Sequence, residues 1–385
     1  MVLAVTLLLI IAGFALTQYL VNLHRDTESS LAQRWSTRGQ QAMQAQMPAA
    51  AADCYRTALS YDPDNGQYRL HLAQALLADN RLAEARAHLN SLWEEEPADG
   101  EVNLTLAHLY VRRGDYSKAV RYYSNAINGV WNEEPRAHRI ATGFELANFL
   151  LQQHQLAQAQ AELVAIQADG PANPADQLLL GNLLLQVHEP QRAIQAFDAV
   201  LQRQPDSAQA WLGKAQASLV LADYKEAEHA AAIAADRDPK LDGAQQQLDV
   251  VRELLRLDPA LRGLSLAERS RRTAEAFELA MKRIDGCATQ QGITLTSQNA
   301  SAATQSGGAG ASSESPATDQ LQRRYRAGVQ KQSSATEQAL RKDPDAIEPT
   351  MQFVFDVEKA TAAICPVTDK SDRALLLLAQ HEGGR

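Results

Sequence analysis

Proline and alanine recur at a constant spacing along much of this chain, and this spacing restricts the fold more than any other feature of the sequence. Pro171, Pro205 and Pro239 are evenly spaced. Two runs of alanines keep the same step: Ala51, Ala85 and Ala119, then Ala159, Ala193 and Ala227. The step from Ala119 to Ala159 is longer, so six extra residues separate the two runs. Self-similarity with a period of about 34 residues is typical of helical repeat arrays, in which each unit packs only against its neighbours.

Each repeated unit has the pattern of two helices joined by a short break. The chain is 45% apolar, enough for a sizeable core, and it is rich in Ala, Leu and Gln, whose side chains lose little freedom in a helix. Proline ends most units because it cannot continue a helix. We therefore predict an all-α solenoid of six helix-turn-helix units with these bounds: 32–65, 66–99, 100–133, 140–173, 174–207 and 208–241.

The order of large and small residues within a unit resembles the tetratricopeptide repeat (TPR) family, whose pattern is W-x2-L-G-x2-Y, then A-x3-F, then P. The first unit carries Trp35, Gly39, Ala51, Tyr55 and Pro63, and the fifth carries Leu180, Gly181, Ala193, Phe197 and Pro205. The third unit departs from the pattern, because Trp131 stands where proline is expected and the loop Asn132–Arg139 follows it. The resemblance implies a non-enzymatic scaffold that binds a polypeptide in a concave groove lined by the first helix of every unit.

The groove prediction rests on residues at equivalent positions of the six units. Unit positions 5, 9 and 12 share one helical face, and the residues at one position in successive units form a column. Position 9 holds hydrogen-bonding side chains: Gln40, Gln74, His108, Asn148, Asn182 and Gln216. Position 5 adds apolar side chains, among them Leu70, Leu104, Phe144 and Leu178. Amides can pair with the backbone of a bound chain while apolar residues take its side chains. The alternative is that position 9 serves the fold and that the apolar columns are partly core.

Several classes of function are excluded by what the sequence lacks. The net charge of −9 argues against nucleic acid as a partner, since affinity for phosphates comes mostly from Lys and Arg. The chain has no phosphate-binding loop, zinc-protease motif or nucleophile elbow, and its cysteines form no C-x-x-C pair. We therefore predict no enzyme activity, no metal, no cofactor and no small-molecule substrate.

The N-terminus predicts attachment to a membrane. Val2–Leu23 contains no charged side chain, and 22 helical residues are long enough to cross the hydrocarbon core. Residues 1–24 are therefore predicted to be a single-pass transmembrane anchor. A cleaved signal peptide is the alternative, although the basic segment that would precede it is missing. Arg25, Arg34 and Arg38 follow the apolar run, which by the positive-inside rule favours a cytoplasmic location for the rest of the chain.

After the repeats, we expect a capping helix at residues 242–257 and a C-terminal helical region at 265–295 and 319–385. Ser265 and Glu268 form a capping box that opens one helix, which Gly286 is expected to stop. Residues 320–342, 347–364 and 373–381 are expected to form three more. Residues 296–318 are rich in Ser, Thr, Ala and Gly, and they are expected to be a disordered linker.

Cys287 and Cys365 lie on either side of this linker, at the ends of two expected helices. Either they form a disulfide, or they are two separate, partly buried thiols. A disulfide would place the soluble part outside the cytoplasm, against the arginine count. The extracytoplasmic location is our prediction.

Taken together, the sequence resembles the N-terminally membrane-anchored TPR proteins of bacteria. It predicts a scaffold or adaptor that binds a protein or peptide in its groove and acts in the assembly or maintenance of an envelope complex. The alternative is a co-chaperone or enzyme regulator that acts through the C-terminal helical tail.

Overall fold

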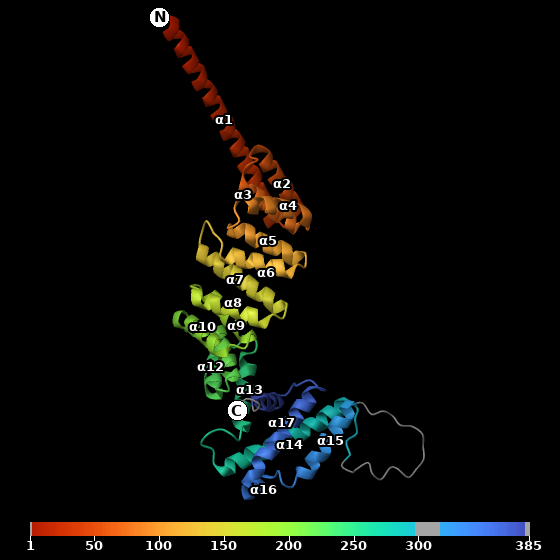
Figure 1. Cartoon of the computed structure of the whole chain (residues 1–385). Coiled ribbons are helices and arrows are strands. Elements are labelled where there is room, and N and C mark those ends of the chain that lie inside the picture. The colour runs from red at the N-terminus through yellow and green to blue at the C-terminus, as the bar shows by residue number, and fades with distance from the viewer. Residues whose placement is uncertain (1, 297–315, 382–385) are drawn as a thin grey trace, which may run out of the picture. The chain divides into compact units, whose positions relative to one another are not determined.

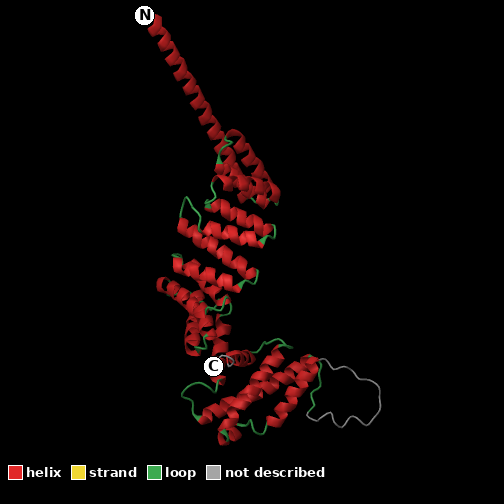
Figure 2. Ribbon diagram, viewed as in Figure 1, coloured by secondary structure: helices red, strands yellow, loops and turns green. Residues whose placement is uncertain are grey.

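The computed structural model describes residues 2–296 and 316–381, apart from the side chains of residues 2–13, 15–16, 20–23 and 26 in the first helix and of residues 316–317 (Figure 1). All regular elements in this part of the chain are helices (Figure 2), so the all-α prediction is confirmed. The chain divides into two compact units, unit 1 at residues 1–171 and unit 2 at residues 172–385.

Unit 1 consists of eight helices that pack as consecutive pairs. Their bounds are α1 Val2–Gln44, α2 Pro48–Tyr61, α3 Gly66–Ala78, α4 Leu82–Glu95, α5 Gly100–Arg112, α6 Tyr116–Ile127, α7 Pro135–Gln152 and α8 Leu156–Asp169. Each of the first four predicted repeats coincides with one pair, although the first repeat uses only the last part of α1. Unit 1 is a helical-repeat fold.

The turn inside each repeat has the same backbone conformation. One residue per turn has a positive φ: Gln46, Asn80, Gly114, His154, His188 and Ala222. The next amide bonds to a carbonyl five residues earlier, as Arg81 N does to Leu76 O at 2.8 Å. This is the pattern of a Schellman cap, in which a left-handed residue satisfies the last carbonyls of a helix. These turns recur at the same step as the alanines, with one longer step between Gly114 and His154, which confirms the period and the insertion.

Polar side chains start the first helix of several repeats. Asn65, Asp99 and Ser207 each accept a hydrogen bond from the backbone N–H three residues later, which satisfies one of the donors left open at a helix start. Asn173 caps α9 in a similar way through Ala175 N.

Helix α1 runs without a break from Val2 to Gln44, a length of 43 residues. The predicted anchor and the first helix of the first repeat are thus one continuous helix. Among the described residues, none of the helices combines the length and the apolar character needed to cross a membrane. Most side chains of the predicted anchor lie outside the described part of the chain, so this finding does not cover them.

Unit 2 contains the last two repeats and the C-terminal helices. Its helices are α9 Pro174–Gln186, α10 Pro190–Arg203, α11 Ala208–Val220, α12 Tyr224–Arg237, α13 Ala244–Leu257, α14 Leu266–Gln290, α15 Pro316–Lys331, α16 Glu337–Lys342, α17 Ile347–Ala362 and α18 Lys370–His381, with a 3-10 turn at Pro344–Ala346. Helix α13 packs against α12 as the expected capping helix, and α18 returns to pack against α13.

Phe197 on α10 is the central core residue of the last two repeats. It is 0% exposed and its ring faces two glycines, Gly181 of α9 and Gly213 of α11. A Cβ atom at either glycine would lie 2.4–2.5 Å from the ring. These glycines allow the three helices to approach closely around one large side chain, so Gly181 is a packing residue.

Three expectations for the C-terminal region are wrong in detail. Helix α14 does not stop at Gly286 but continues to Gln290, because Gly286 is exposed and Cys287 and Ala288 beyond it are buried. The helix expected at 320–342 is two helices, because Thr336 starts a new one by accepting a hydrogen bond from Ala339 N. Residues 316–318 of the expected linker belong to α15, and residues 297–315 lie outside the described part.

Candidate functional site

A large cavity lies in unit 1, beside the first helices of the second and third repeats. Its volume is about 930 Å³. Six of its lining residues occupy unit positions 5, 9 and 12: Met43, Gln74, Leu77, Leu104, His108 and Val111. The spacing of four and three along each helix places these side chains on one face. The repeat pattern therefore accounts for the floor of the cavity.

The predicted polar column is partly engaged in bonds between repeats. Gln74 Nε2 donates to Glu101 Oε1 at 3.1 Å and so joins α3 to α5. The His108 ring nitrogen Nε2 lies 2.6 Å from Glu145 Oε2 and joins α5 to α7. Asn148 Nδ2 donates to Phe144 O of its own helix at 2.9 Å. In unit 1, Gln74 and His108 thus link the inner helices of neighbouring repeats, whereas Asn148 bonds within its own helix.

The other three members of the column are exposed. Gln40 lies on α1 in unit 1, and Asn182 and Gln216 lie on α9 and α11 in unit 2. No side-chain hydrogen bond joins any of them to the described residues. Their amides are open to solvent.

The predicted apolar residues differ in exposure. Leu70 and Phe144 are 3% and 6% exposed, so they contribute mainly to the core. Leu104 is half-buried and lines the cavity. Leu178, in unit 2, is half-buried against the cluster of Val200, Leu201 and Ala210. Of these four side chains, Leu104 is the one that lines the cavity floor.

Trp131 and His138 line the cavity beside α5. The backbone of Val130 accepts from Gly100 N at 2.8 Å and donates to Ala98 O at 2.7 Å. The Trp131 Nε1–H donates to Ala126 O at 2.9 Å, and its ring stacks on His138 with centroids 4.4 Å apart. A Cβ atom at Gly100 would lie 2.3 Å from the Trp131 ring, so this contact requires the glycine.

The extra residues of the third repeat are therefore only partly a loop. Helix α7 begins at Pro135, within the segment Asn132–Arg139 that was expected to be loop. Asn132, Glu133 and His138 of this segment line the cavity. The insertion lengthens α7 and supplies residues that the repeat itself does not have.

The charges in the cavity are mainly negative. Asp99, Glu101 and Glu133 line it together with one arginine, Arg112. The Asp99 carboxylate accepts from Val102 N at 2.9 Å as the cap of α5. Close to the floor, burial, followed by the charge of Glu145, raises the pKa of Tyr123 to about 12, so its hydroxyl stays neutral.

Sequence reasoning did not find Trp131, His138, Glu101 or Arg112 as site residues. A signal was present for Trp131, since it replaces the proline of the repeat pattern just before the insertion. For Glu101 and Arg112 the signal is weaker, because charged residues at helix ends are common in any helical protein. Their place in the site depends on the cavity.

A second cavity of about 780 Å³ lies in unit 2 between the turn after α11, residues 260–262 and the end of α18. The Tyr224 hydroxyl and His381 Nδ1 are 3.0 Å apart at its edge. None of the predicted site residues lines it. Within the described residues, no group of three or more His, Cys, Asp or Glu could hold a metal ion.

Cys287 and Cys365 form a disulfide in unit 2, with Cα atoms 5.8 Å apart. Leu321 of α15 packs against it, fully buried. Beside it, Arg283 donates to the carbonyls of Cys365 and Pro366, each at 3.0 Å, and lies 3.5 Å from Asp372 Oδ2. The pairing that the sequence left open is present in the structure. Cys54, the third cysteine, is a half-buried free thiol.

Two family models match the chain. Residues 20–137 match the model described as "Cytochrome c-type biogenesis protein H TPR domain", and residues 178–242 match one described as "Tetratricopeptide repeat". TPRs are therefore found in both units. No curated protein matches the chain.

Several solved structures are similar to the chain. YrrB, titled "a TPR protein with an unusual peptide-binding site", is 18% identical over 50% of this chain and 97% of its own, with a TM-score of 0.39. PilF of Pseudomonas aeruginosa is 18% identical over 58% and 97%, with a TM-score of 0.40. PilW, titled a "widely conserved type IV pilus biogenesis factor", is 17% identical over 56% and 98%, also with a TM-score of 0.40. With TM-scores below 0.5, these likenesses say nothing about what the chain binds.

Proposed function

We propose that this chain is a membrane-anchored TPR scaffold that binds a polypeptide partner in the unit 1 cavity. The observation that carries the proposal is that equivalent positions of successive repeats meet on one concave surface, where apolar side chains alternate with hydrogen-bonding ones. A polypeptide offers both a polar backbone and apolar side chains, and so fits such a surface.

The scaffold would act in the assembly or maintenance of an envelope complex. Support comes from the match of residues 20–137 to the TPR domain of cytochrome c-type biogenesis protein H. Assembly of c-type cytochromes is therefore the first process to test for a defect when the chain is removed.

The anchor would hold the cavity close to the membrane. Val2–Leu23 is uncharged, and α1 continues without a break into the first repeat. From Leu23 to Ala32 the helix rises only about 14 Å, at roughly 1.5 Å per residue. A partner would thus be bound next to the bilayer. Alkaline extraction of membranes tests this, since release of the full chain into the supernatant would argue against an anchor.

The soluble part would lie outside the cytoplasm. The disulfide supports this location, because disulfides persist mainly in oxidising compartments. Thiol labelling of intact cells, with and without prior reduction, is the test. We expect Cys287 and Cys365 to react with the label in intact cells only after reduction. If they instead react without reductant, and only once the cells are lysed, this location is ruled out.

Binding in the cavity can be tested with peptides selected on phage against the purified full chain. Leu104→Asp places a carboxylate on the cavity floor and is expected to weaken these peptides at least about tenfold, because a buried unpaired charge is costly. The control is Leu156→Asp on α8, where the leucine is 46% exposed and away from the cavity. Thermal unfolding of each variant shows whether the fold is kept.

The opposite outcome is equally specific. Leu266 is an exposed apolar residue at the start of α14. Peptides that respond to Leu266→Asp but not to Leu104→Asp would place binding on the C-terminal region and favour the alternative of a co-chaperone or enzyme regulator.

A further inference from the structure

The third repeat carries a charge at unit positions 2 and 13, near the two ends of its first helix, and the other repeats have uncharged residues at these two positions. Unit position 2 holds Gln33, Gln67, Glu101, Ala141, Ala175 and Gln209. Unit position 13 holds Gln44, Ala78, Arg112, Gln152, Gln186 and Val220. Glu101 is thus the one acid in its column and Arg112 the one base in its own. The repeat fold does not require either charge.

Both charges line the unit 1 cavity, at opposite ends of α5. Eleven residues separate them along the helix, which corresponds to about 16 Å at roughly 1.5 Å per residue. The cavity therefore has an acidic end and a basic end a known distance apart.

The charge at the acidic end is not neutralised by a cation. Glu101 accepts a hydrogen bond from Gln74, which is a neutral donor. Asp99 and Glu133 line the same cavity, and no described lysine or arginine forms an ion pair with any of the three. A ligand that brings a positive charge here would meet unpaired carboxylates.

At the other end, Arg112 is exposed and forms no ion pair with any described residue. Its neighbours along the lining are apolar, Leu77, Ala78 and Val111. Between the two ends, Leu104, Thr105 and His108 of α5 line the cavity. The cavity thus offers a negative end, a middle where Leu104 is the apolar contact, and a positive end.

We propose that the partner is a polypeptide segment with a cationic side chain at the Glu101 end, apolar side chains in the middle and an anionic group at the Arg112 end. The inference rests on the proposed function and names the chemistry of the bound segment. An extended chain spans about 16 Å in roughly five residues at 3.3 Å each, so two charges five residues apart match the two ends. The charges also fix the direction in which the segment lies.

Four labelled six-residue peptides test this, all blocked at both termini and identical in their four middle residues. The first residue is Lys or Gln and the last is Glu or Gln, in all four combinations, and fluorescence anisotropy gives the affinity for the full chain in detergent. An exposed ion pair contributes up to about fivefold in affinity. We expect the Lys and Glu peptide to bind about tenfold tighter than the peptide with Gln at both ends.

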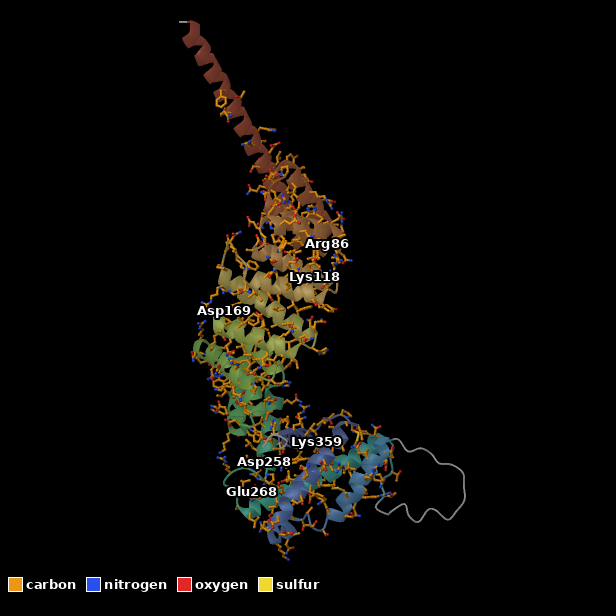
Figure 3. All side chains as sticks on the ribbon, in the orientation of Figure 1. Arg86, Lys118, Asp169, Asp258, Glu268 and Lys359 are labelled. Carbon is orange, nitrogen blue, oxygen red and sulfur yellow. A yellow bond between two sulfur atoms is a disulfide. The ribbon has the colours of Figure 1, made fainter. Side chains whose placement is uncertain are left out.

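Variants of the chain separate the two ends. The double variant Glu101→Gln and Glu133→Gln is expected to abolish the preference for Lys and keep the preference for Glu. Arg112→Gln is expected to do the reverse. The controls are Glu94→Gln and Arg86→Gln on α4, which change an exposed acid and an exposed base outside the cavity; Arg86 is labelled in Figure 3.

The outcomes distinguish this inference from the proposed function. Equal affinity for all four peptides, with all of them weakened by Leu104→Asp, overturns the charge inference and leaves the proposed function standing. The charge inference is also overturned if a control variant removes the preference for Lys or for Glu as fully as the cavity variant does. If none of the four peptides binds the full chain, both proposals fail.

Discussion

Within unit 2, the last two repeats and the C-terminal bundle of α14–α18 have different interiors. Among the described residues of the two repeats, Ser218 is the one buried polar side chain. The bundle instead buries charged and hydroxyl side chains: Ser270, Thr273, Arg283, Thr350, Glu358, Thr361, Ser371 and Asp372. The bundle also contains the disulfide.

This contrast predicts different sensitivities for the two regions. The described residues of the two repeats bury no Asp, Glu, His, Lys or Arg, so pH and reductant should affect them little. The bundle contains a buried acid and a covalent link, so both conditions should change its stability. The following predictions test this division, beginning with the largest effect.

Of the proposed substitutions, Phe197→Ala is expected to cause the largest loss of stability, and this loss should be in the last two repeats. The ring is 0% exposed and fills the space that Gly181 and Gly213 leave open, and a buried Phe→Ala change costs about 3–5 kcal/mol. Urea denaturation followed by circular dichroism measures the loss. Leu179→Ala on the exposed side of α9 is the control and should cost less than about 0.5 kcal/mol. Equal effects of the two changes would refute this account of the core.

Replacing both bonded cysteines, Cys287→Ser and Cys365→Ser, is expected to destabilise the bundle but not the repeats. The bond closes a separation of 78 residues, and removing a disulfide typically costs about 2–4 kcal/mol. Hydrogen exchange of α14 and α17 peptides, compared with α9 and α10, is the measurement. If the exchange rate of α9 and α10 increases as much as that of α14 and α17, the two regions unfold together.

Glu358 makes the bundle sensitive to pH. The side chain is 0% exposed, and neither of its carboxylate oxygens has a hydrogen-bond partner among the described residues. Burial, and then the charge of Asp372, raises its pKa from 4.5 to about 8. The pKa of Asp372 is also raised by burial, against the effect of Arg283. The folded bundle thus holds a proton on Glu358 at neutral pH.

The stability of the bundle should therefore fall as pH rises. The folded state binds this proton more tightly than the unfolded state, so its contribution is fully present below about pH 4.5 and is lost as pH rises through about 8. Glu358→Gln keeps the shape without the charge and is expected to gain about 4 kcal/mol at pH 9 relative to its effect at pH 5. Thermal unfolding at several pH values measures this, and a variant that follows the parent at every pH would contradict it.

The repeat positions were predictable from sequence because each repeat meets the same surroundings as the one before it. A residue such as Phe197 is therefore marked by its counterparts one period away along the chain. The same reasoning gave the cavity floor at Leu104 and His108. It could not show that Leu70, in the same column as Leu104, would be buried, because exposure depends on the neighbouring helix and not on the period.

Features outside the period were not predictable in the same way. Trp131 interrupts the repeat pattern, but only the backbone bonds of Val130 place it beside α5. Glu358 lies on a helix whose apolar pattern was visible, yet its surroundings come from α14, far away in sequence, and from α18, the next helix along the chain. Gly286 was misread as a helix stop, since a glycine on an exposed face costs only about 1 kcal/mol and packing of the next turn offsets it.

The smallest expected effect concerns the turn between α11 and α12. Ala222 has φ +56°, in a position that Gly114 fills in the third repeat. A left-handed conformation costs an L-residue other than glycine about 1–2 kcal/mol, part of which is returned by the lower entropy of the unfolded alanine chain. Ala222→Gly is therefore expected to stabilise the sixth repeat by about 0.5–1 kcal/mol, and Gly114→Ala to destabilise the third by a similar amount. Both are measured by urea denaturation. Because a Cβ at Gly114 would meet no atom within 4 Å, a loss above about 2 kcal/mol there would mean that more than backbone conformation holds these turns.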